Sequence, residues 1–303
     1  MAVARVTVLG ASSQIGLFAL PYLVARGMQV AAISRGGPPP NYPAIPGLHW
    51  LRPEDAGDSP AGRADSLLST GPLELARTWL KTAPGIRRLV AFSTSSLASK
   101  VGSPDPRERE TMRRIAEEET ALRAACRDND VSLCVLRPTL VYGCGLDRNV
   151  SLIARLIETW GFFPVVRGAT GLRQPVHAED LARAAVEALC TGCDAAGPLV
   201  LCGGSTLPYR QMVEAVFTAL QRRPRLPELP PGLLAATVRL AGLWPSLREL
   251  NPEMVRRQRI DLVFDDAQAR QVLGHRPRPF QPGRDDFRLP APERLRRIAG
   301  QEC

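Results

Sequence analysis

The sequence predicts an α/β protein with a doubly wound parallel sheet and a smaller C-terminal substrate-binding region. Three observations support this class: a strand–helix–strand unit at the N-terminus, an alternation of strand and helix patterns up to residue 202, and a change of pattern after Gly203. At 303 residues with 45% hydrophobic content, the chain is long enough to bury a sizeable core.

The first unit occupies residues 3–34. Val3–Leu9 is rich in β-branched residues and stops at Gly10, which is typical of a strand. Ile15–Arg26 carries apolar residues at helical spacing, and Met28–Ser34 is a second apolar strand. Because a helix joins the two strands, they are expected to lie parallel in one sheet.

The turn between the first strand and the helix has the features of a phosphate site. Gly10 and Gly16 let the main chain approach a pyrophosphate, and the helix start offers free N–H groups. Ser13 stands where such turns often have another glycine, and its Cβ restricts close approach, so a plain strand–helix corner stays open as the alternative. The residues expected to contact a dinucleotide, including the end of the strand at 64–69, are Gly10, Ser12, Ser13, Gln14, Ile15, Gly16, Ser69 and Thr70.

Further strand and helix patterns alternate along the chain. Strands are expected at Leu48–Arg52, Ala64–Ser69, Arg88–Ser93, Val131–Leu136 and Leu199–Cys202. Helices are expected at Leu73–Leu80, Glu108–Asn129, Glu179–Cys190, Tyr209–Gln221 and Leu233–Leu243. Between residues 53 and 63, prolines and glycines leave little room for the helix that most such sheets have there.

The charge balance does not predict a nucleic-acid partner. The net charge is +9, but the basic residues are scattered among acids with no aromatic-interleaved stripe. A positive field still favours a phosphorylated substrate. Cys190 and Cys193 form a lone CxxC that favours a helix end over a metal or redox site, so no metal is expected. With no run of about 20 apolar residues and no secretory pattern, we expect a cytoplasmic protein.

Four motifs appear in the order and spacing of one enzyme family: residues 10–16 (GASSQIG), 92–96 (FSTSS), 136–143 (LRP, then Tyr-Gly) and 173–180 (RQPVHAED). With them, residues 3–285 resemble the extended short-chain dehydrogenase/reductases, the NAD(P)-dependent nucleotide-sugar epimerases and dehydratases. The resemblance implies a Rossmann-type dinucleotide-binding domain at 1–138, continued by 174–203. It assigns 139–173 and 204–303 to a substrate-binding or lid region, and it implies a homodimer through the long helix at 108–129.

The resemblance also implies roles for single residues. Ser95 corresponds to the serine that polarises the substrate, with a capped strand end as the alternative. Pro138 and Thr139 correspond to the place where the nicotinamide lies. Arg173 corresponds to an arginine that pairs with the substrate's diphosphate, although a surface salt bridge stays open. His177 is expected to be a packed histidine.

The residue after the second strand bears on the choice of cofactor. NAD-binding folds usually place an acid there to hold the ribose 2′-hydroxyl. This chain has Ser34 and Arg35, and no acid before Glu54. Because an arginine favours a 2′-phosphate, NADP(H) is expected over NAD(H).

The family's Tyr-x-x-x-Lys pair is missing from this sequence. None of the four tyrosines is followed four residues later by a lysine, and the matching positions fall near Glu110 and Arg114. Such a lysine lowers the tyrosine pKa so that the phenol can transfer a proton near neutral pH. Glu110, Lys100 or a water is therefore expected to handle the proton, although Glu110 with Arg114 also fits a solvated ion pair and Lys100 a loop surface lysine.

Two further functions stay open. The loss of the pair also fits a non-catalytic protein that senses NADP(H) or braces a complex. Residues 229–247 form an amphipathic stretch that fits peripheral membrane contact by an enzyme acting on a lipid-linked sugar, with a packed lid helix as the alternative.

Overall fold

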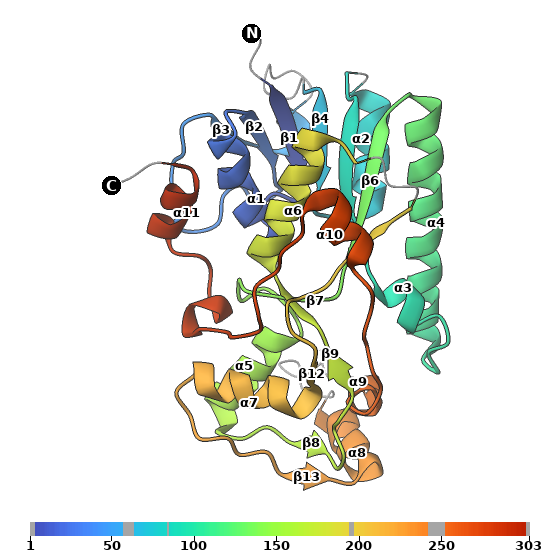
Figure 1. The fold of residues 1–303 in the computed structure, drawn as a ribbon, viewed down its shortest axis with the longest axis vertical. Coiled ribbons are helices and arrows are strands. Elements are labelled where there is room, and N and C mark those ends of the chain that lie inside the picture. Colours follow the sequence, from blue (N-terminus) through green and yellow to red (C-terminus); the bar gives the residue numbers. More distant parts are fainter. Residues whose placement is uncertain (1–3, 57–63, 84, 194–196, 242–251, 301–303) are drawn as a thin grey trace.

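The computed structural model describes residues 4–56, 64–83, 85–193, 197–241 and 252–300 (Figure 1). A parallel sheet with helices on both faces occupies the upper half of that view, and a smaller lobe lies below it. No helix among the described residues combines the length and apolar character needed to cross a membrane.

The central sheet has seven strands in the order β11-β6-β5-β4-β1-β2-β3, and every neighbouring pair is parallel. The strands are β1 (Arg5–Leu9), β2 (Gln29–Ile33), β3 (Leu48–Leu51), β4 (Ser66–Ser69), β5 (Arg88–Phe92), β6 (Ser132–Pro138) and β11 (Leu199–Leu201). The order reverses between β1 and β4, and the crevice at such a reversal is where these sheets bind ligands. The predicted doubly wound parallel sheet is confirmed.

Two pairs of helices cover the two faces of the sheet. Helices α1 (Gln14–Ala25) and α6 (Ala178–Thr191) pack on one face, and α2 (Leu73–Thr82) and α4 (Pro106–Asp128) on the other. Because side chains alternate along a strand, β5 sends Val90 and Phe92 into the first core and Leu89 and Ala91 into the second. Both faces are thereby buried, which explains the nearly continuous apolar strands.

Helix α1 contains a proline, and the hydrogen bond that this proline cannot donate is supplied by a side chain from outside the helix. Pro21 has no N–H to donate to the carbonyl of Leu17. The hydroxyl of Tyr42 donates to that carbonyl instead, at 3.1 Å. The 3-10 helix Pro53–Asp55 is the regular structure described between β3 and β4, and the rest of that expected break, residues 57–63, lies outside the described residues.

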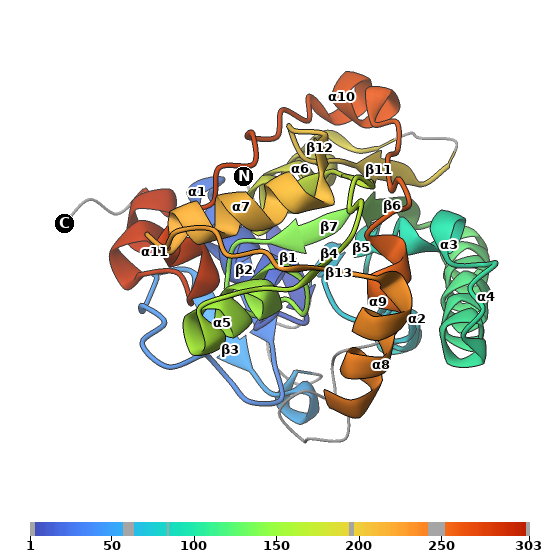
Figure 2. The same ribbon diagram turned by 90° about the horizontal axis from the view of Figure 1, so that it is seen from below.

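The lobe below the sheet consists of short elements. Its helices are α5 (Val150–Trp160), α7 (Tyr209–Ala219), α8 (Pro231–Ala241) and α9 (Pro252–Arg257), and Figure 2 shows them from the lobe side. Three strand pairs accompany them: β7 (Leu140–Tyr142) with β10 (Pro175–His177), β9 (Leu172–Arg173) with β12 (Leu207–Pro208), and β8 (Val165–Val166) with β13 (Glu228–Leu229). The expected helix at 233–243 corresponds to α8, and residues 242 and 243 lie outside the described residues.

The C-terminal tail returns from the lobe to the sheet. Helix α10 (Ala267–Leu273) packs on α6 and β11, and α11 (Pro292–Ile298) packs on α1. Ala269, Leu273 and Leu295 join the apolar core between the sheet, α1 and α6. The segment 204–303, expected to form a lid, is therefore divided, and its last part completes the core of the sheet domain.

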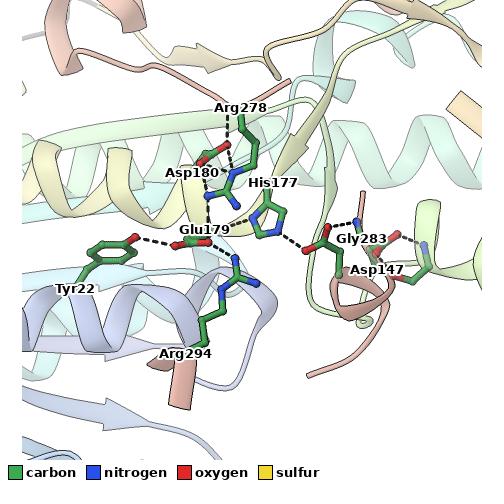
Figure 3. A network of polar contacts seen from close by, with 10 residues as sticks. Tyr22, Asp147, His177, Glu179, Asp180, Arg278, Gly283 and Arg294 are labelled. Carbon is green, nitrogen blue, oxygen red and sulfur yellow. Dashed lines mark hydrogen bonds and ion pairs between the residues drawn. The ribbon is translucent and has the colours of Figure 1, made fainter. Parts of the chain in front are cut away.

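Ion pairs fasten this tail (Figure 3). Asp180 accepts from the guanidinium and amide of Arg278, and Glu179 pairs with Arg278 and Arg294. The buried His177 ring accepts from the Glu179 amide at Nδ1, so a neutral ring carries its proton on Nε2, 3.1 Å from Asp286. His177 thus packs and positions the tail.

Candidate functional site

A cavity of about 830 Å³ lies between the sheet and the lobe. Its wall at the sheet end comes from the start of α1, the segment after β5 and the start of α4. Side chains of α5, α7, α8 and α9 line the lobe end. Of the residues singled out from the sequence, the following line this cavity: Gln14, Ser95, Lys100, Thr139 and Arg173.

The glycines of the first turn are required by close packing. Gly10 has φ +71°, and a Cβ on it would lie 2.8 Å from the amide nitrogen of Gly71. A Cβ on Gly16 would lie 2.6 Å from the carbonyl oxygen of Ala11. Both contacts are shorter than a side chain tolerates, so this corner holds its shape only with glycine at these positions.

Ser13 occupies the centre of the turn as the N-cap of α1. Its hydroxyl accepts a hydrogen bond from the Gly16 amide at 3.0 Å and donates one to the Thr70 hydroxyl at 2.9 Å. Thr70 in turn donates toward the carbonyls of Leu9 and Gly10. The hydroxyl groups of Ser13 and Thr70 are therefore used to build the corner.

Two amides in the first turn of α1 remain free. Within the described part of the chain, the N–H groups of Gln14 and Ile15 have no acceptor. Both stand at the start of a 12-residue helix, where free amides and the helix dipole favour an anion. The Gln14 side-chain Oε1 is buried and has no hydrogen-bond partner among the described residues. The free amides of Gln14 and Ile15 fit the phosphates of a dinucleotide, with Ser13 as the departure.

Other residues expected at the cofactor lie around this corner. Arg35 is exposed directly after β2, and the Ser12 and Ser34 hydroxyls are 3.0 Å apart. Ser69 is buried at the end of β4 with an unpartnered hydroxyl. Pro138 and Thr139 follow from β6, where the Pro138 carbonyl accepts from the Ser95 amide at 3.2 Å. The Thr139 hydroxyl donates to the Gln174 carbonyl at 2.5 Å.

Ser95 begins the short helix α3 (Ser96–Ser99) at the cavity wall. Its side chain is 7% exposed, and in the described residues its hydroxyl has no hydrogen-bond partner. The neighbouring Thr94 hydroxyl accepts from the Ser96 amide at 3.1 Å and so caps the helix. The Ser95 hydroxyl is therefore available to a ligand, whereas the Thr94 hydroxyl already accepts a hydrogen bond from the main chain.

The structure does not bring Glu110 to this cavity. Its side chain is 53% exposed on α4 and pairs with Arg113 one turn further on, at 2.7 Å. Arg114 is exposed as well. Glu108, two residues earlier, lines the cavity instead. Since successive helical residues are about 100° apart, Glu108 and Glu110 lie on nearly opposite faces of α4.

Glu108 is the centre of a charged group that the sequence did not single out. The Arg257 guanidinium donates to both its oxygens at 2.8 and 2.7 Å, and the Ser103 hydroxyl donates at 2.8 Å. The Lys100 ammonium lies 3.7 Å from Glu108 Oε1. Burial alone would raise the pKa of Glu108, but the hydrogen bonds from Arg257 and Ser103 lower it. Burial and the charge of Arg257 lower the pKa of Lys100.

Arg173 lies at the lobe end of the cavity and is only 3% exposed. Its guanidinium donates to the main-chain carbonyls of Leu172, Ile260 and Arg257 and lies 5.4 Å from the centre of the Tyr209 ring. Burial lowers its pKa to about 10. A salt bridge with Glu179 or Asp180, the expected alternative, does not form, because those acids pair with the tail.

Neither Glu108 nor Arg257 carried a motif. The only signal for Glu108 was the density of charge in residues 107–118, which fits a solvated helix equally well, and Arg257 lies outside that segment. The described residues contain no group of three or more His, Cys, Asp or Glu side chains that could hold a metal ion.

Comparisons with known proteins agree with the fold described above. Residues 68–197 match the profile of the "NAD dependent epimerase/dehydratase family", which confirms the family resemblance over that segment. An uncharacterized protein, y4nG of Sinorhizobium fredii, is 26% identical over 204 residues, covering 65% of this chain. The chain spans about half the length of that relative, since the match covers 50% of it.

Solved structures share the fold at low sequence identity. MoeE5, solved with UDP-glucose and NAD, is 18% identical with a TM-score of 0.64, covering 94% of this chain and 96% of its own. The UDP-N-acetylglucosamine 4-epimerase of Bacillus cereus is 12% identical with a TM-score of 0.66, covering 94% and 95%. These similarities show that the chain shares the fold of these two structures over 94% of its length.

Proposed function

We propose that this chain, which over residues 68–197 belongs to the NAD dependent epimerase/dehydratase family, is an NAD(P)-dependent oxidoreductase or epimerase-like enzyme acting on a nucleotide-linked sugar or related phosphorylated substrate. The observation that carries the proposal is the sheet end of the cavity. There the unpartnered Ser95 hydroxyl and the Lys100 ammonium line the same space as Gln14, next to the free amides that begin α1.

The corner at residues 10–16 would hold the cofactor. The amides of Gln14 and Ile15 would donate to its phosphates, with Pro138 and Thr139 beside the nicotinamide. When bound, the dinucleotide supplies reversible hydride transfer. Arg35 and the lack of an acid after β2 favour NADP(H), while NAD is the cofactor present in the MoeE5 structure.

The remaining roles belong to side chains of the cavity. Ser95 would donate a hydrogen bond to the reacting oxygen of the substrate. Arg173 would bind the phosphate end with the N–H groups that remain, since its bonds to main-chain carbonyls use three of the five donors of a guanidinium. The similar B. cereus UDP-glucuronic acid 4-epimerase was solved with its nucleotide sugar and NAD, which supports this substrate class.

A binding measurement followed by a turnover screen tests the proposal. Quenching of protein fluorescence reports binding of NADPH and NADH. Loss of absorbance at the reduced nicotinamide reports net reduction of keto forms in a panel of nucleotide sugars, and chromatography of the products reports epimerisation, which consumes no reduced cofactor. We expect binding of NADPH in preference to NADH and turnover with at least one panel member. No affinity for either dinucleotide would contradict the proposal.

A non-catalytic cofactor-binding protein is the second candidate, and the absence of a Tyr-x-x-x-Lys pair favours it. Tight NADPH binding without turnover across the panel would support a sensor or scaffold. A lipid-linked substrate is the third, because α8 exposes Leu233 and Leu240. Co-sedimentation with anionic vesicles tests it, and failure to pellet would exclude it.

A homodimer through α4 remains part of the proposal. The outward face of this helix carries Glu110, Arg113 and Glu117, which pair with one another within the helix. Light scattering during gel filtration gives the mass directly, for comparison with 32.9 kDa for one chain. We expect twice that mass, and a monomer at all concentrations would exclude the dimer.

A further inference from the structure

One group of side chains in the cavity contains the means to move a proton although the tyrosine is absent. Lys100, Ser103, Glu108 and Arg257 come from the end of α3, the loop after it, the start of α4 and the end of α9. We call them the Lys100 cluster. Figure 1 shows α9 of the lobe below α3 and the foot of α4, so the cluster joins the lobe to the sheet domain.

The other titratable side chains of the cavity wall are committed elsewhere. Asp147 accepts from the amides of Asn149 and Ser151 at the start of α5. Tyr209 lies at the lobe end under Arg173, and burial raises its pKa to about 12. Arginines do not release a proton in the working pH range. Among the described groups, Lys100 is left as a proton donor on the wall that it shares with Ser95.

We propose that Lys100 exchanges the proton with the substrate oxygen held by Ser95, and that Glu108 and Arg257 are positioning residues that fix its ammonium at the cavity wall. This assignment rests on the proposed function. In the family that the sequence resembles, a tyrosine transfers the proton and a lysine assists it. In this chain, Lys100 would transfer the proton and the carboxylate of Glu108 would assist it. Lys100 is thereby a catalytic residue, whereas Glu108 and Arg257 act through it.

The proposed step balances in both directions. In reduction, the carbonyl carbon gains a C–H bond from the transferred hydride, and the oxygen takes the electron pair of the former π bond. Lys100 then gives one proton to that oxygen and becomes a neutral amine. In oxidation, the neutral amine would take the hydroxyl proton as the C–H bond breaks, with the oxidised dinucleotide accepting the hydride. Solvent returns Lys100 to its starting state after each turnover.

The charges around Lys100 suit this task. Glu108 of α4 and Arg257 of α9 are the charged groups that act on it, and their effects oppose one another. Burial and Arg257 favour the neutral amine, whereas Glu108 favours the ammonium. An amine held between these effects can adopt both forms nearer to neutral pH than an exposed lysine can.

Arg257 also links the cluster to the phosphate end of the cavity. Its side chain is held by Glu108, while its main-chain carbonyl accepts from Arg173. A ligand that draws Arg173 away from this carbonyl would alter the support of Arg257. The reacting end and the binding end of the cavity are therefore connected through one residue of the lobe.

Lysine labelling tests the assignment without turnover. The chain has two lysines, and Lys81 is an exposed internal reference on α2. Acetylation by a limiting pulse of acetic anhydride, from about pH 6 to about pH 11, is read for each lysine by peptide mass spectrometry. We expect Lys100 to titrate below Lys81. Glu108→Gln should lower the Lys100 midpoint further, and Arg257→Gln should raise it.

Glu110→Gln is the matched control, since it changes the same residue type two positions along the same helix and outside the cavity. It should leave the Lys100 midpoint unchanged. A Lys100 that titrates with Lys81, or a midpoint that moves equally in Glu108→Gln and Glu110→Gln, would overturn the assignment. Circular dichroism establishes that the variants compared are folded.

Turnover then separates this assignment from the function it rests on. Lys100→Arg keeps the positive charge beside Glu108 but cannot release a proton, so NADPH affinity should persist while kcat falls about 10²–10⁴-fold. If wild type turns over and Lys100→Arg does so equally with an unchanged pH profile, the lysine assignment fails and the enzyme proposal stands. If the wild type binds no dinucleotide, the enzyme proposal itself fails.

Discussion

Replacing Ser13 tests whether the first turn is a phosphate cradle. The Ser13 hydroxyl holds the Gly16 amide and the Thr70 hydroxyl. Alanine removes both bonds. The lost N-cap costs about 1 kcal/mol and the lost hydrogen bond about 1 kcal/mol more, so the free energy of unfolding should fall by about 2 kcal/mol. Glycine is tolerated at an N-cap, so Ser13→Gly should lose only about 1 kcal/mol.

Cofactor affinity should move in the opposite direction. Both variants free the Gly16 amide, which adds a third donor to those of Gln14 and Ile15. One hydrogen bond to a charged group contributes about 1.5–3 kcal/mol, so Kd for NADPH should fall by about tenfold or more if the phosphate reaches this amide. Glycine, which removes the Cβ, should give the tighter binding of the two.

Thermal melting and fluorescence titration measure the two effects. For a chain of this size, about 1 kcal/mol corresponds to about 2–4 °C in Tm. Ser66→Ala, at the opposite end of β4, is the control and should change neither quantity, because Ser66 is bonded only to the neighbouring Asp65 on the surface. Weaker NADPH binding in Ser13→Gly than in wild type would refute the added contact to the Gly16 amide. An NADPH affinity that neither Ser13 variant changes would count against the cradle.

Three further perturbations have outcomes that follow from single contacts. Ser95→Ala should reduce kcat about 10²–10³-fold and leave Tm unchanged, because the Ser95 hydroxyl has no hydrogen-bond partner among the described residues. Thr94→Ala should lower Tm with a smaller loss of kcat, because the Thr94 hydroxyl accepts from the Ser96 amide. The reverse pattern would exclude Ser95 as the polarising group. Gly143→Ala would place a Cβ 2.3 Å from Nε2 of His177, so chemical denaturation should show that the free energy of unfolding falls by about 2–4 kcal/mol. Gly192 also has a positive φ but faces open space, so Gly192→Ala should lower it by only about 1 kcal/mol. Equal losses in the two variants would contradict this packing. Burial would raise the pKa of Glu179, but Arg294, Tyr22 and Arg278 hold it at about 2. The ionised Glu179 therefore stabilises the fold above about pH 4.5, and this stabilisation is lost as the pH falls from about 4.5 to about 2. Wild type should lose stability over this range more steeply than Glu179→Gln, and parallel curves would refute the pairing.

The sheet domain could be predicted from the sequence because its signals are local. A strand such as β1 is a run of apolar residues, and the helix after it has its own period, so each element is legible in a short window. Helices α7 and α8 of the lobe have such a period, but the short strands of the lobe could not be predicted in this way. Strands β8, β9, β12 and β13 are two residues long, and they form because distant segments pair, as Leu207 does with Arg173. A strand of two residues is too short to show the alternation of apolar and polar residues by which strands are recognised.

The site was predictable where a motif lies at the end of a strand. Ser95 follows β5 and Thr139 follows β6, and the carboxyl ends of neighbouring parallel strands meet at one edge. The position on α4 was harder to predict. Motif spacing pointed to Glu110, but the face that a helix turns inward depends on its packing against α2, and a shift of two residues reverses it. Glu108 and Arg257 are 149 positions apart, so only the folded chain brings them together.

The cavity contains one lysine among several arginines, and the two residue types differ in whether they can release a proton. The chain has two lysines among its 39 basic residues, yet one of them lines the cavity beside a carboxylate. Arg257 and Arg173 supply fixed positive charge there, because a guanidinium stays protonated even where burial lowers its pKa. An ammonium differs in being able to lose its proton when it is partly desolvated. Under the proposal for Lys100, arginine supplies the permanent charge and the rigid donors of the cavity, and lysine supplies the proton that is given and recovered.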